Sequence, residues 1–586
     1  MKTGSAALAF LVLCVFCVRA FVVEVNDKGD PLRWHLSPPE PPVPPNPAEQ
    51  GVHTNVVNPV TKAVRFYLAA GAYSASNTAA ELNAVRAAFA QWQSIPGTVL
   101  KFEDAGLVAP GVDVNTSDNT NVVFWAKNST FVNGGRDNIN GTLGLTFNSF
   151  FPDNNAQAEA DIVFNGVQYA WFTDFNSPDL NRYFVESTAA HEIGHFLGLK
   201  HSPVGGATML FHGALGVNAQ AGLSSDEVAA AKWLYGEPAT LATLGRLQGR
   251  VTMNGSNVFG AVVLAEEAAS GNLVAGTVSR ADGSYDLPAM PPGQYAVRLT
   301  PLDPAGASPF LIRGREIGAA YDSAETGFLP TTPVTLALAA GATITRDFEL
   351  TGGSSAFRIT QIRSPTLDAG YFFSSGFPAS LRPGQSNLFI GVGSATLPTN
   401  GATLKITGDG LTVGTASFDT LSGMNFVSVP IDVASNATPG LRSFVLQRGT
   451  DIAYANGFLE IQASVPDFNF DGLDDRFQRK YFELFTAPEA GPGADPDGDG
   501  VSNQAEYLAG TNPTLRIESV RLDARGSTIT WQSAPQKSYQ LWSRRDLAGD
   551  RWQTVGSPVM ATGALTEFTD SSATNNFRFY RVQVLP

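Results

Sequence analysis

Three histidines and a glutamate lie close together in the stretch from His191 to His201. Residues four apart on an α-helix lie on the same face, so His191 and His195 can hold one metal ion between their rings. Glu192 directly follows the first histidine, which places its carboxylate beside the metal without making it a ligand. These residue types at this spacing predict metal-assisted hydrolysis, with Glu192 as the base that acts on a bound water.

A catalytic zinc usually takes three protein ligands and keeps a fourth position open for water. Gly198 can adopt the left-handed conformation that ends many helices, so the chain can turn there and return His201 to the metal. A lone histidine on an apolar helix face is more often an ordinary core residue. Because three histidines, a glutamate and a glycine rarely coincide at this spacing, the stretch predicts a zinc site made by His191, His195 and His201.

The stretch resembles the zinc-binding signature of the metzincin metalloproteases, which place a methionine in a turn beneath the three histidines. Met209, which follows Gly205 and Gly206, resembles that Met-turn in the matrixin branch, the branch of the matrix metalloproteinases. The segment from Leu223 to Gly236 resembles the closing helix of a matrixin domain. Taken alone, Met209 could be core filler, as most methionines are.

The resemblance covers about residues 31–237 and implies an α+β catalytic domain, in which a twisted mixed sheet carries the metal-binding helix. Residues 142–147 resemble the edge strand on which the family binds its peptide substrate as an added strand. Animal matrixins hold a structural zinc with histidines around this strand, and none occurs here, so that zinc is in doubt. His212, just after the Met-turn, is more easily explained as a loop histidine than as a pocket residue.

The elements that must position these residues are also visible in the sequence. Apolar residues at helical spacing predict a helix from Thr78 to Gln93, with Thr78 as its N-cap. Runs of apolar and β-branched residues predict strands at residues 64–68, 100–102, 122–125, 142–147 and 160–164.

Length and composition indicate several packed units with an extracellular character. The chain has 586 residues, enough for about four domains. Only 16% of the residues are charged and the formal net charge is −15, which argues against nucleic acid and anionic membranes as partners but is compatible with bound calcium.

Residues 1–20 resemble a secretory signal peptide, with an apolar run that ends before the small residue Ala20. A lipoprotein is disfavoured, because bulky residues precede both Cys14 and Cys17. These are the only cysteines, so the mature protein is expected to have no disulfides and no cysteine switch of the kind that keeps animal matrixins latent. No later stretch approaches the roughly 20 apolar residues of a membrane helix, and we expect a secreted, extracellular protein.

The remaining sequence predicts further segments around the catalytic domain at residues 61–237. Residues 21–60 form a proline-rich arm or a short propeptide, and the sequence does not decide between them. Residues 243–351, which we call the first β-module, contain Asp-Gly and Pro-Gly turns between short strands. This pattern resembles a carboxypeptidase regulatory-like sandwich. The second β-module, residues 356–464, resembles an immunoglobulin-like sandwich, and the C-terminal sandwich, residues 515–586, resembles a fibronectin-like one, with its aromatic residues in the core.

Two acidic loops in residues 467–514 have the ligand spacing of EF-hand-type calcium loops, as in dockerins. The stronger loop supplies Asp495, Asp497, Asp499, the Val501 carbonyl, Asn503 and Glu506. The weaker loop supplies Asp467, Asn469, Asp471, the Leu473 carbonyl and Asp475. It is weaker because Gln478 stands where a charged bidentate carboxylate is usual. An acidic, solvated linker is the alternative for both, and calcium as a structural stabiliser is the prediction.

Together these features predict a secreted, zinc-dependent metalloendopeptidase with protein or peptide substrates. Its β-modules could bind extracellular-matrix or cell-surface ligands. The alternative is a calcium-stabilised adhesion or scaffold protein whose metal domain is vestigial. All the residues that catalysis would require are present in the sequence. A domain that had lost its activity would not need to keep them.

Overall fold

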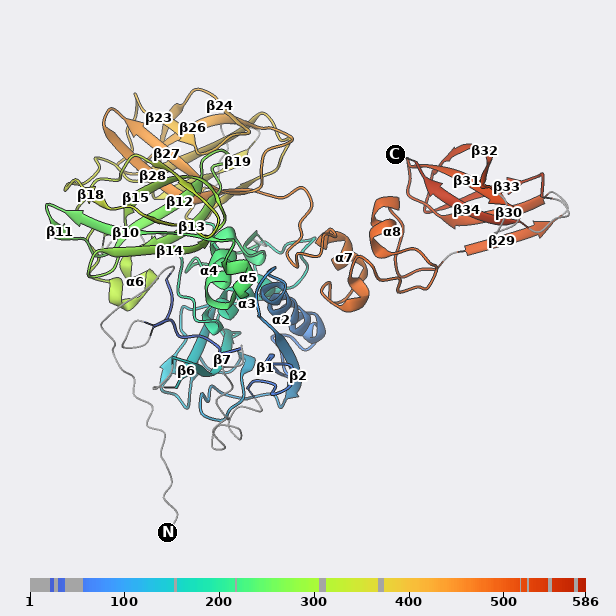
Figure 1. Ribbon diagram of the computed structural model, residues 1–586, viewed down its shortest axis with the longest axis horizontal. Coiled ribbons are helices and arrows are strands. Elements are labelled where there is room, and N and C mark those ends of the chain that lie inside the picture. The colour runs from blue at the N-terminus through green and yellow to red at the C-terminus, as the bar shows by residue number, and fades with distance from the viewer. Residues whose placement is uncertain are drawn as a thin grey trace, which may run out of the picture. The chain divides into compact units, whose positions relative to one another are not determined.

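The computed structural model describes residues 22–25, 30–36, 56–151, 155–216, 219–304, 312–366, 374–516, 518–523, 526–545, 551–573 and 578–585. The predicted signal peptide and the proline-rich stretch of residues 37–47 lie outside these ranges. The chain divides into two compact units, Met1–Ser464 and Val465–Pro586 (Figure 1).

A five-stranded sheet lies under the helix that carries the predicted metal ligands His191 and His195. Its strands, in spatial order, are β2 (Phe102–Val108), β1 (Val64–Ala69), β3 (Val122–Ala126), β7 (Gln157–Asn165) and β6 (Gly144–Phe150). β1 pairs in parallel with β2 and β3, and β3 pairs in parallel with β7. β6 runs antiparallel to β7 at the end of the sheet, so the sheet is mixed. Two short strand pairs complete this domain, β4 (Phe131–Val132) with β5 (Asp137–Asn138) and β8 (Trp171–Phe172) with β9 (Tyr183–Phe184).

Helices α2 (Thr78–Gln93) and α3 (Val185–Phe196) pack against each other over this sheet (Figure 1). The predicted range of α2 is confirmed, but Asn77 rather than Thr78 holds the N-cap position. The Thr78 hydroxyl instead donates to the Ser74 carbonyl at 2.6 Å.

Buried aromatic rings fix helix α3 in this core. Phe89 of α2 stacks on Phe66 of β1 with ring centroids 3.9 Å apart, and it meets Phe196 of α3 edge-on at 5.6 Å. The fully buried Trp92 donates its indole N–H to the Ala190 carbonyl of α3 at 2.9 Å. The apolar face that the spacing predicted is therefore the face that carries α3.

The described part of the N-terminal arm packs beside the end of α3. Val23 forms an antiparallel bridge with Leu199, and the Lys200 N–H donates to the Val22 carbonyl at 2.7 Å. Further along, the buried Trp34 donates its indole N–H to the Phe196 carbonyl at 2.9 Å. These residues are built into the catalytic core, and they brace the segment that leads to His201.

Helix α4 (Ser225–Tyr235) closes the catalytic domain and joins it to the first β-module. Ser224 and Glu227 form a capping box at its start. The buried Asp226 accepts a hydrogen bond from the Ser202 hydroxyl at 2.7 Å and another from the Gly276 N–H of the first β-module at 2.8 Å. A short helix, α5 (Pro238–Leu241), follows α4.

Two sheets form the first β-module. One contains β10 (Gly245–Met253), β11 (Ser256–Asn257), β14 (Ser284–Met290), β17 (Thr343–Thr345) and β18 (Phe348–Leu350). The other contains β12 (Ala261–Glu267), β13 (Leu273–Val278), β15 (Gly293–Pro301) and β16 (Val334–Leu338). Between β15 and β16 lie the short helices α6 (Gly314–Ile317) and η2 (Ala319–Tyr321).

The second β-module also consists of two sheets. One contains β19 (Gln361–Thr366), β20 (Ser374–Ser375), β22 (Leu388–Ser394), β24 (Leu411–Val413), β25 (Ser417–Leu421) and β26 (Met424–Val433). The other contains β21 (Ala379–Leu381), β23 (Thr403–Ile406), β27 (Gly440–Arg448) and β28 (Asp451–Ile461).

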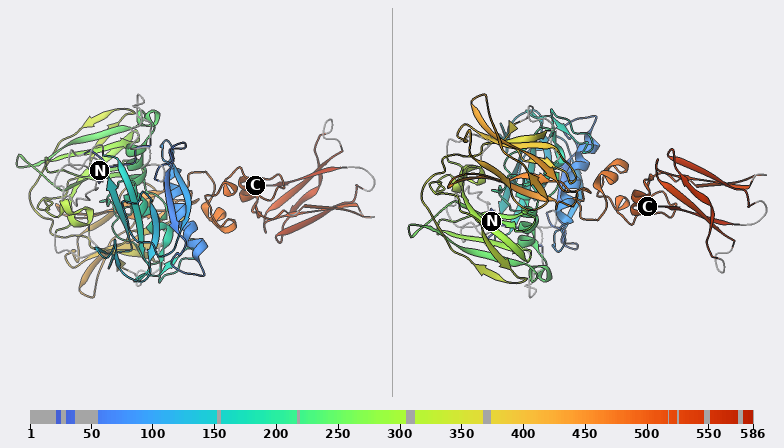
Figure 2. Two further views of the ribbon diagram at one scale, coloured as in Figure 1. Left: turned by 90° about the horizontal axis from the view of Figure 1, so that it is seen from below. Right: turned by 90° about the horizontal axis from the view of Figure 1, so that it is seen from above.

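The catalytic domain and the two β-modules form a single compact unit (Figure 2). One hydrophobic cluster runs from the catalytic helices into the first β-module, with members such as Phe196, Leu234 and Leu287. The Gly205–Gly206 turn lets the second β-module approach closely, because a Cβ at Gly205 would lie 2.3 Å from the Phe458 ring. The two β-modules are thus packed directly against the catalytic domain.

The second unit contains the acidic loops and the C-terminal sandwich. Its elements are α7 (Asp475–Tyr481), η3 (Pro488–Ala490), α8 (Asn503–Ala509), β29 (Glu518–Asp523), β30 (Gly526–Gln532), β31 (Ser538–Arg544), β32 (Gln553–Met560), β33 (Leu565–Asp570) and β34 (Phe579–Val584). Trp531 and Tyr539 lie in the sandwich core, as predicted, whereas Trp542 and Trp552 are only half-buried and pack against Arg581. Among the helices that the structure describes, none is long and apolar enough to cross a membrane.

Candidate metal centre

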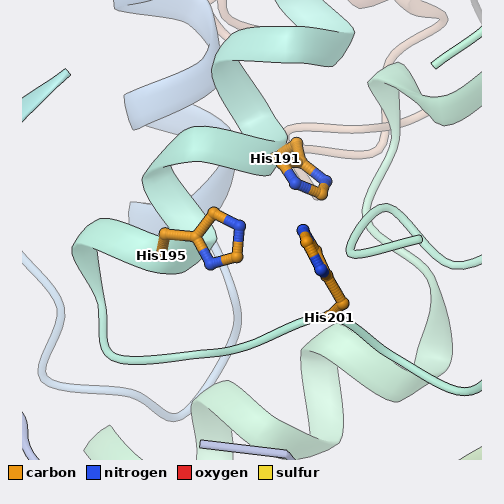
Figure 3. A group of neighbouring side chains, drawn as sticks. All are labelled: His191, His195 and His201. Atoms are coloured by element: carbon orange, nitrogen blue, oxygen red, sulfur yellow. The ribbon is translucent and has the colours of Figure 1, made fainter. Parts of the chain in front are cut away.

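The predicted ligands His191, His195 and His201 converge (Figure 3). The first two project from α3, and His201 comes from the loop after it. The three ring centroids lie 4.8 to 5.3 Å apart, and each ring offers a nitrogen within 4.8 Å of one on each of the others. Gly198 has φ of +96°, so the predicted left-handed turn does return His201 to the site.

Each histidine donates its Nδ1 hydrogen to a backbone carbonyl. His191 donates to Thr208 and His195 to Leu199, both at 2.8 Å, and His201 donates to Glu316. With Nδ1 occupied as a donor, the tautomer is fixed and Nε2 keeps its lone pair for a metal. The donor set therefore fits a zinc ion with three nitrogen ligands.

The electrostatics of the site favour neutral rings. Burial lowers the pKa of His191 to about 4 and that of His201 to about 3, and it also lowers the pKa of His195. A metal ligand must be the neutral imidazole, so at neutral pH no proton has to be removed before an ion binds.

Glu192 lies beside the three rings with its carboxylate held by the edge strand. Its side chain is almost fully buried, and the Thr146 hydroxyl of β6 donates to its Oε2 at 2.7 Å. Burial raises the pKa of Glu192 to about 7, with the Thr146 hydrogen bond opposing part of that rise. A carboxyl group with a pKa near neutrality can both accept and release a proton, as a general base must do in one cycle.

Alternate residues of β6 face α3, because successive side chains of a strand point to opposite faces. The Thr146 hydroxyl oxygen also lies 3.0 Å from the Glu192 carbonyl oxygen, and Asn148 donates its side-chain amide to the His195 carbonyl at 3.0 Å. Gly144 is the third residue of β6 that faces α3, and a Cβ there would lie 2.7 Å from Oε1 of Glu192. The sequence showed this strand but not its three contacts with the metal-binding helix.

Replacing Gly144 by alanine should impair hydrolysis by moving the Glu192 carboxylate. A Cβ at 2.7 Å from a carboxylate oxygen is closer than packing allows, so either the side chain or the strand must shift. A misplacement of about 1 Å can cost on the order of 100-fold in rate. We expect a large fall in kcat with bound zinc unchanged, measured by peptide hydrolysis and metal analysis. Gly293→Ala is the matched control, because its Cβ would meet only ordinary contacts at 3.6 Å.

Met209 lies beneath the histidines. It is buried, and a Cβ at Gly194 would lie 2.1 Å from its sulfur, so the glycine between the two helical histidines makes room for the methionine. The Met209 N–H donates to Oε1 of Glu227 at 2.9 Å. Sequence reasoning found Met209 but missed the roles of Gly194 and Glu227. The spacing of Ser224 and Glu227 was a detectable capping-box signal, although nothing in it pointed to the Met-turn.

His212 does not join the metal ligands. Its ring stacks on Phe377 of the second β-module with centroids 4.6 Å apart, and burial lowers its pKa. His212 is therefore a loop histidine, as the sequence predicted. Its ring forms part of the packing between the catalytic domain and the second β-module.

The stronger acidic loop brings three of its predicted ligands together in the second unit. Oxygen atoms of Asp495, Asp497 and Asp499 lie within 4.8 Å of one another. Glu506 is 1% exposed, and both of its carboxylate oxygens are buried without a hydrogen-bond partner among the described residues. Burial raises the pKa of Glu506 to about 7, with the Thr511 side chain opposing part of that rise and the neighbouring aspartates adding to it. A buried carboxylate with two free oxygens at loop position 12 suits a bidentate calcium ligand.

The weaker loop is partly closed by its own side chains. Asp467 accepts hydrogen bonds from the N–H groups of Asp471 and Gly472, and Gln478 donates to Oδ2 of Asp471 at 2.7 Å. The side-chain oxygens of Asn469 and Gln478 stay buried without a partner in the described part of the chain. This loop therefore keeps some oxygens for a cation but with less negative charge.

Comparisons with known proteins agree with the geometry of the histidine site. A protein-family model described as matrixin matches residues 61–236. This part of the chain is a matrixin-like catalytic domain, and the match supports a metallopeptidase that uses zinc. No curated protein sequence is similar enough to match the chain.

Two solved structures show only remote similarity. A variant of BcpA, the major pilin subunit of Bacillus cereus, is 9% identical with a TM-score of 0.14, over 56% of this chain and 85% of the pilin. Fervidolysin from Fervidobacterium pennivorans, a keratinolytic enzyme related to subtilisin, is 12% identical with a TM-score of 0.12, over 37% of this chain and 31% of fervidolysin. At these TM-scores neither structure bears on the fold or the function.

Proposed function

We propose that this protein is a secreted zinc metalloendopeptidase that cleaves peptide bonds in proteins, with Glu192 as the general base. The observation that carries the proposal is the convergence of three neutral imidazoles, each with Nδ1 occupied, beside a buried carboxylate. A zinc ion held by His191, His195 and His201 would act as a Lewis acid and lower the pKa of a water at the open position.

The protein's own groups supply the proton transfers and the orientation of the substrate. Glu192 accepts a proton from the attacking water and passes it to the leaving amine. Thr146 holds the carboxylate for this role through its 2.7 Å hydrogen bond. β6 lies at the end of the sheet, so a peptide can add to it as a further strand and place its scissile bond beside Glu192.

The proposal is tested with purified protein on casein or gelatin. We expect cleavage that 1,10-phenanthroline abolishes and that added zinc restores. Zinc-loaded, folded protein that cleaves neither substrate would favour the alternative, an adhesion or scaffold protein with a vestigial metal domain.

Secretion is part of the proposal and rests on the sequence of residues 1–20 and on the lack of cysteines after Cys17. Removal of this segment after Ala20 would leave Phe21 at the new N-terminus. Mass spectrometry of protein recovered from culture medium checks this point. Outside the cell, the β-modules would meet extracellular-matrix or cell-surface ligands.

We also infer that calcium binds the stronger acidic loop through Asp495, Asp497, Asp499, the Val501 carbonyl, Asn503 and Glu506, and the weaker loop with lower affinity. Support comes from the two unpartnered oxygens of Glu506 among the described residues and from the neighbouring aspartates that help to raise its pKa. A cation bound only by the folded state stabilises it, by about 2.7 kcal/mol at a concentration of 100 times Kd.

Calcium should therefore raise the melting temperature of residues 465–586 within the full chain, as followed by calorimetry. Glu506→Gln should remove most of this increase, because it deletes the charged bidentate ligand. Glu489→Gln, at an exposed glutamate nearby, is the control and should keep it. A melting temperature that does not respond to calcium in the parent protein would contradict the calcium assignment.

A further inference from the structure

One of the three hydrogen bonds that orient the zinc ligands comes from outside the catalytic domain. Thr208 and Leu199, which accept from His191 and His195, belong to the same domain as the ligands. Glu316, whose carbonyl accepts from Nδ1 of His201, lies on α6 in the first β-module. The ring of His201 is therefore held between the metal site on one side and α6 on the other.

The helix α6 is held firmly enough to position a ligand. The Arg313 guanidinium donates to both carboxylate oxygens of Glu316, one of them at 2.9 Å. Ile317 is 1% exposed and packs in a hydrophobic cluster with Val204 and Leu210, which flank the Met-turn. Gly314 lies so close to η2 that a Cβ there would be 1.7 Å from the Tyr321 carbonyl oxygen.

The backbone before His201 is fixed from a second direction by the N-terminal arm. The Glu24 N–H donates to the Gly198 carbonyl at 2.8 Å, and a Cβ at Gly198 would lie 2.2 Å from the Leu32 carbonyl oxygen. The main chain leading to His201 therefore has little freedom, but these contacts leave rotation of the imidazole unrestrained. The only described hydrogen bond from that ring is the one to Glu316.

We propose that Glu316 is a positioning residue for the zinc ligand His201, which makes the first β-module a structural part of the metal centre. The proposal rests on the zinc site of the proposed function. A carbonyl that accepts from Nδ1 fixes the tautomer and the orientation of a ligating histidine, and loss of such a partner typically costs about 10- to 100-fold in metal affinity. The catalytic domain alone lacks this partner.

A backbone carbonyl cannot be deleted by substitution, so the test displaces α6. Gly314→Ala in the full chain introduces a Cβ 1.7 Å from the Tyr321 carbonyl oxygen, so α6 and the adjoining η2 must move apart. Zinc Kd is measured by competition with a chromogenic chelator, and the visible spectrum of the cobalt-substituted protein reports ligand geometry. We expect at least about a 10-fold weaker zinc Kd and an altered cobalt spectrum. Gly293→Ala in the same module should change neither.

Arg313→Met provides a second route if Gly314→Ala fails to fold. It removes both bonds to the Glu316 carboxylate and keeps the aliphatic stem, so we expect a smaller loss of zinc affinity and a cobalt spectrum shifted in the same direction. A merely structural role for α6 would lower the melting temperature without moving either metal readout. If folded variants keep the parental zinc Kd and cobalt spectrum, the positioning role is wrong while the zinc site stands. If the parent itself binds no zinc, both proposals fall.

Discussion

Replacing Glu192 by glutamine is expected to lower kcat/KM for peptide hydrolysis by about 10²- to 10⁴-fold, because the amide cannot accept the proton of the attacking water. Glutamine has nearly the size of glutamate and can still accept the Thr146 hydrogen bond, so the fold and the three histidines should be undisturbed. Zinc content should stay equal to that of the parent, since Glu192 is not a ligand in this site. The measurement is steady-state hydrolysis of a fluorogenic peptide together with metal analysis of the same sample.

Two further variants sharpen this result. Glu237→Gln makes the same chemical change at an exposed site after α4 and should leave the rate unchanged. Thr146→Val removes the hydroxyl that holds the carboxylate, so we expect an intermediate rate. A zinc-loaded Glu192→Gln protein that hydrolyses peptides at the parental rate would show that another group is the base.

Arg298→Met is expected to destabilise the first unit by about 3 to 5 kcal/mol, the usual cost of leaving one partner of a buried ion pair without the other. The Arg298 side chain has no exposed surface, and its guanidinium pairs with Glu266 at 2.7 Å. The same guanidinium donates to Ser443 and Asn456 of the second β-module, at 2.7 and 2.9 Å. Methionine removes all of these contacts and leaves Glu266 buried between the modules.

The control for this prediction is Arg246→Met in the same β-module. Arg246 pairs with Asp286, which is buried, but the Arg246 side chain is itself 48% exposed, so solvent can replace it in part and its loss should cost clearly less than the loss of Arg298. Urea unfolding followed by tryptophan fluorescence gives the free energy of unfolding of each variant. Equal, small effects for Arg298→Met and Arg246→Met would mean that the two β-modules are not coupled through this network.

The local elements around the site could be predicted because their signals are local. The helical spacing of Leu82, Val85, Phe89 and Trp92 records a face that must be buried, and the structure buries it against α3. The spacing of His191 and His195 fixes their common helix face, and Gly198 marks the turn that follows. The N-cap was misplaced by one residue, since Asn77 and Thr78 are both suited to that role and only the surrounding loop distinguishes them.

The roles of two glycines of the site could not be predicted from local sequence patterns. Gly144 and Gly194 do not have the left-handed backbone that makes a glycine recognisable in a turn. They are needed because Glu192 and Met209 come too close for a Cβ. That requirement comes from how the strand, the helix and the Met-turn pack together, so no motif records it.

The sequence by itself determined the metal chemistry, namely which residues can ligate, which can serve as the base, and which acidic loop has the oxygen spacing for calcium. These properties depend on residue type and on spacings of a few positions, which helix and loop geometry convert directly into distances. Only the tertiary structure decided that the two β-modules pack as walls of the catalytic domain, and that Glu316 reaches His201. Such contacts depend on how separate sheets pack against one another, and short-range sequence patterns carry no record of that packing.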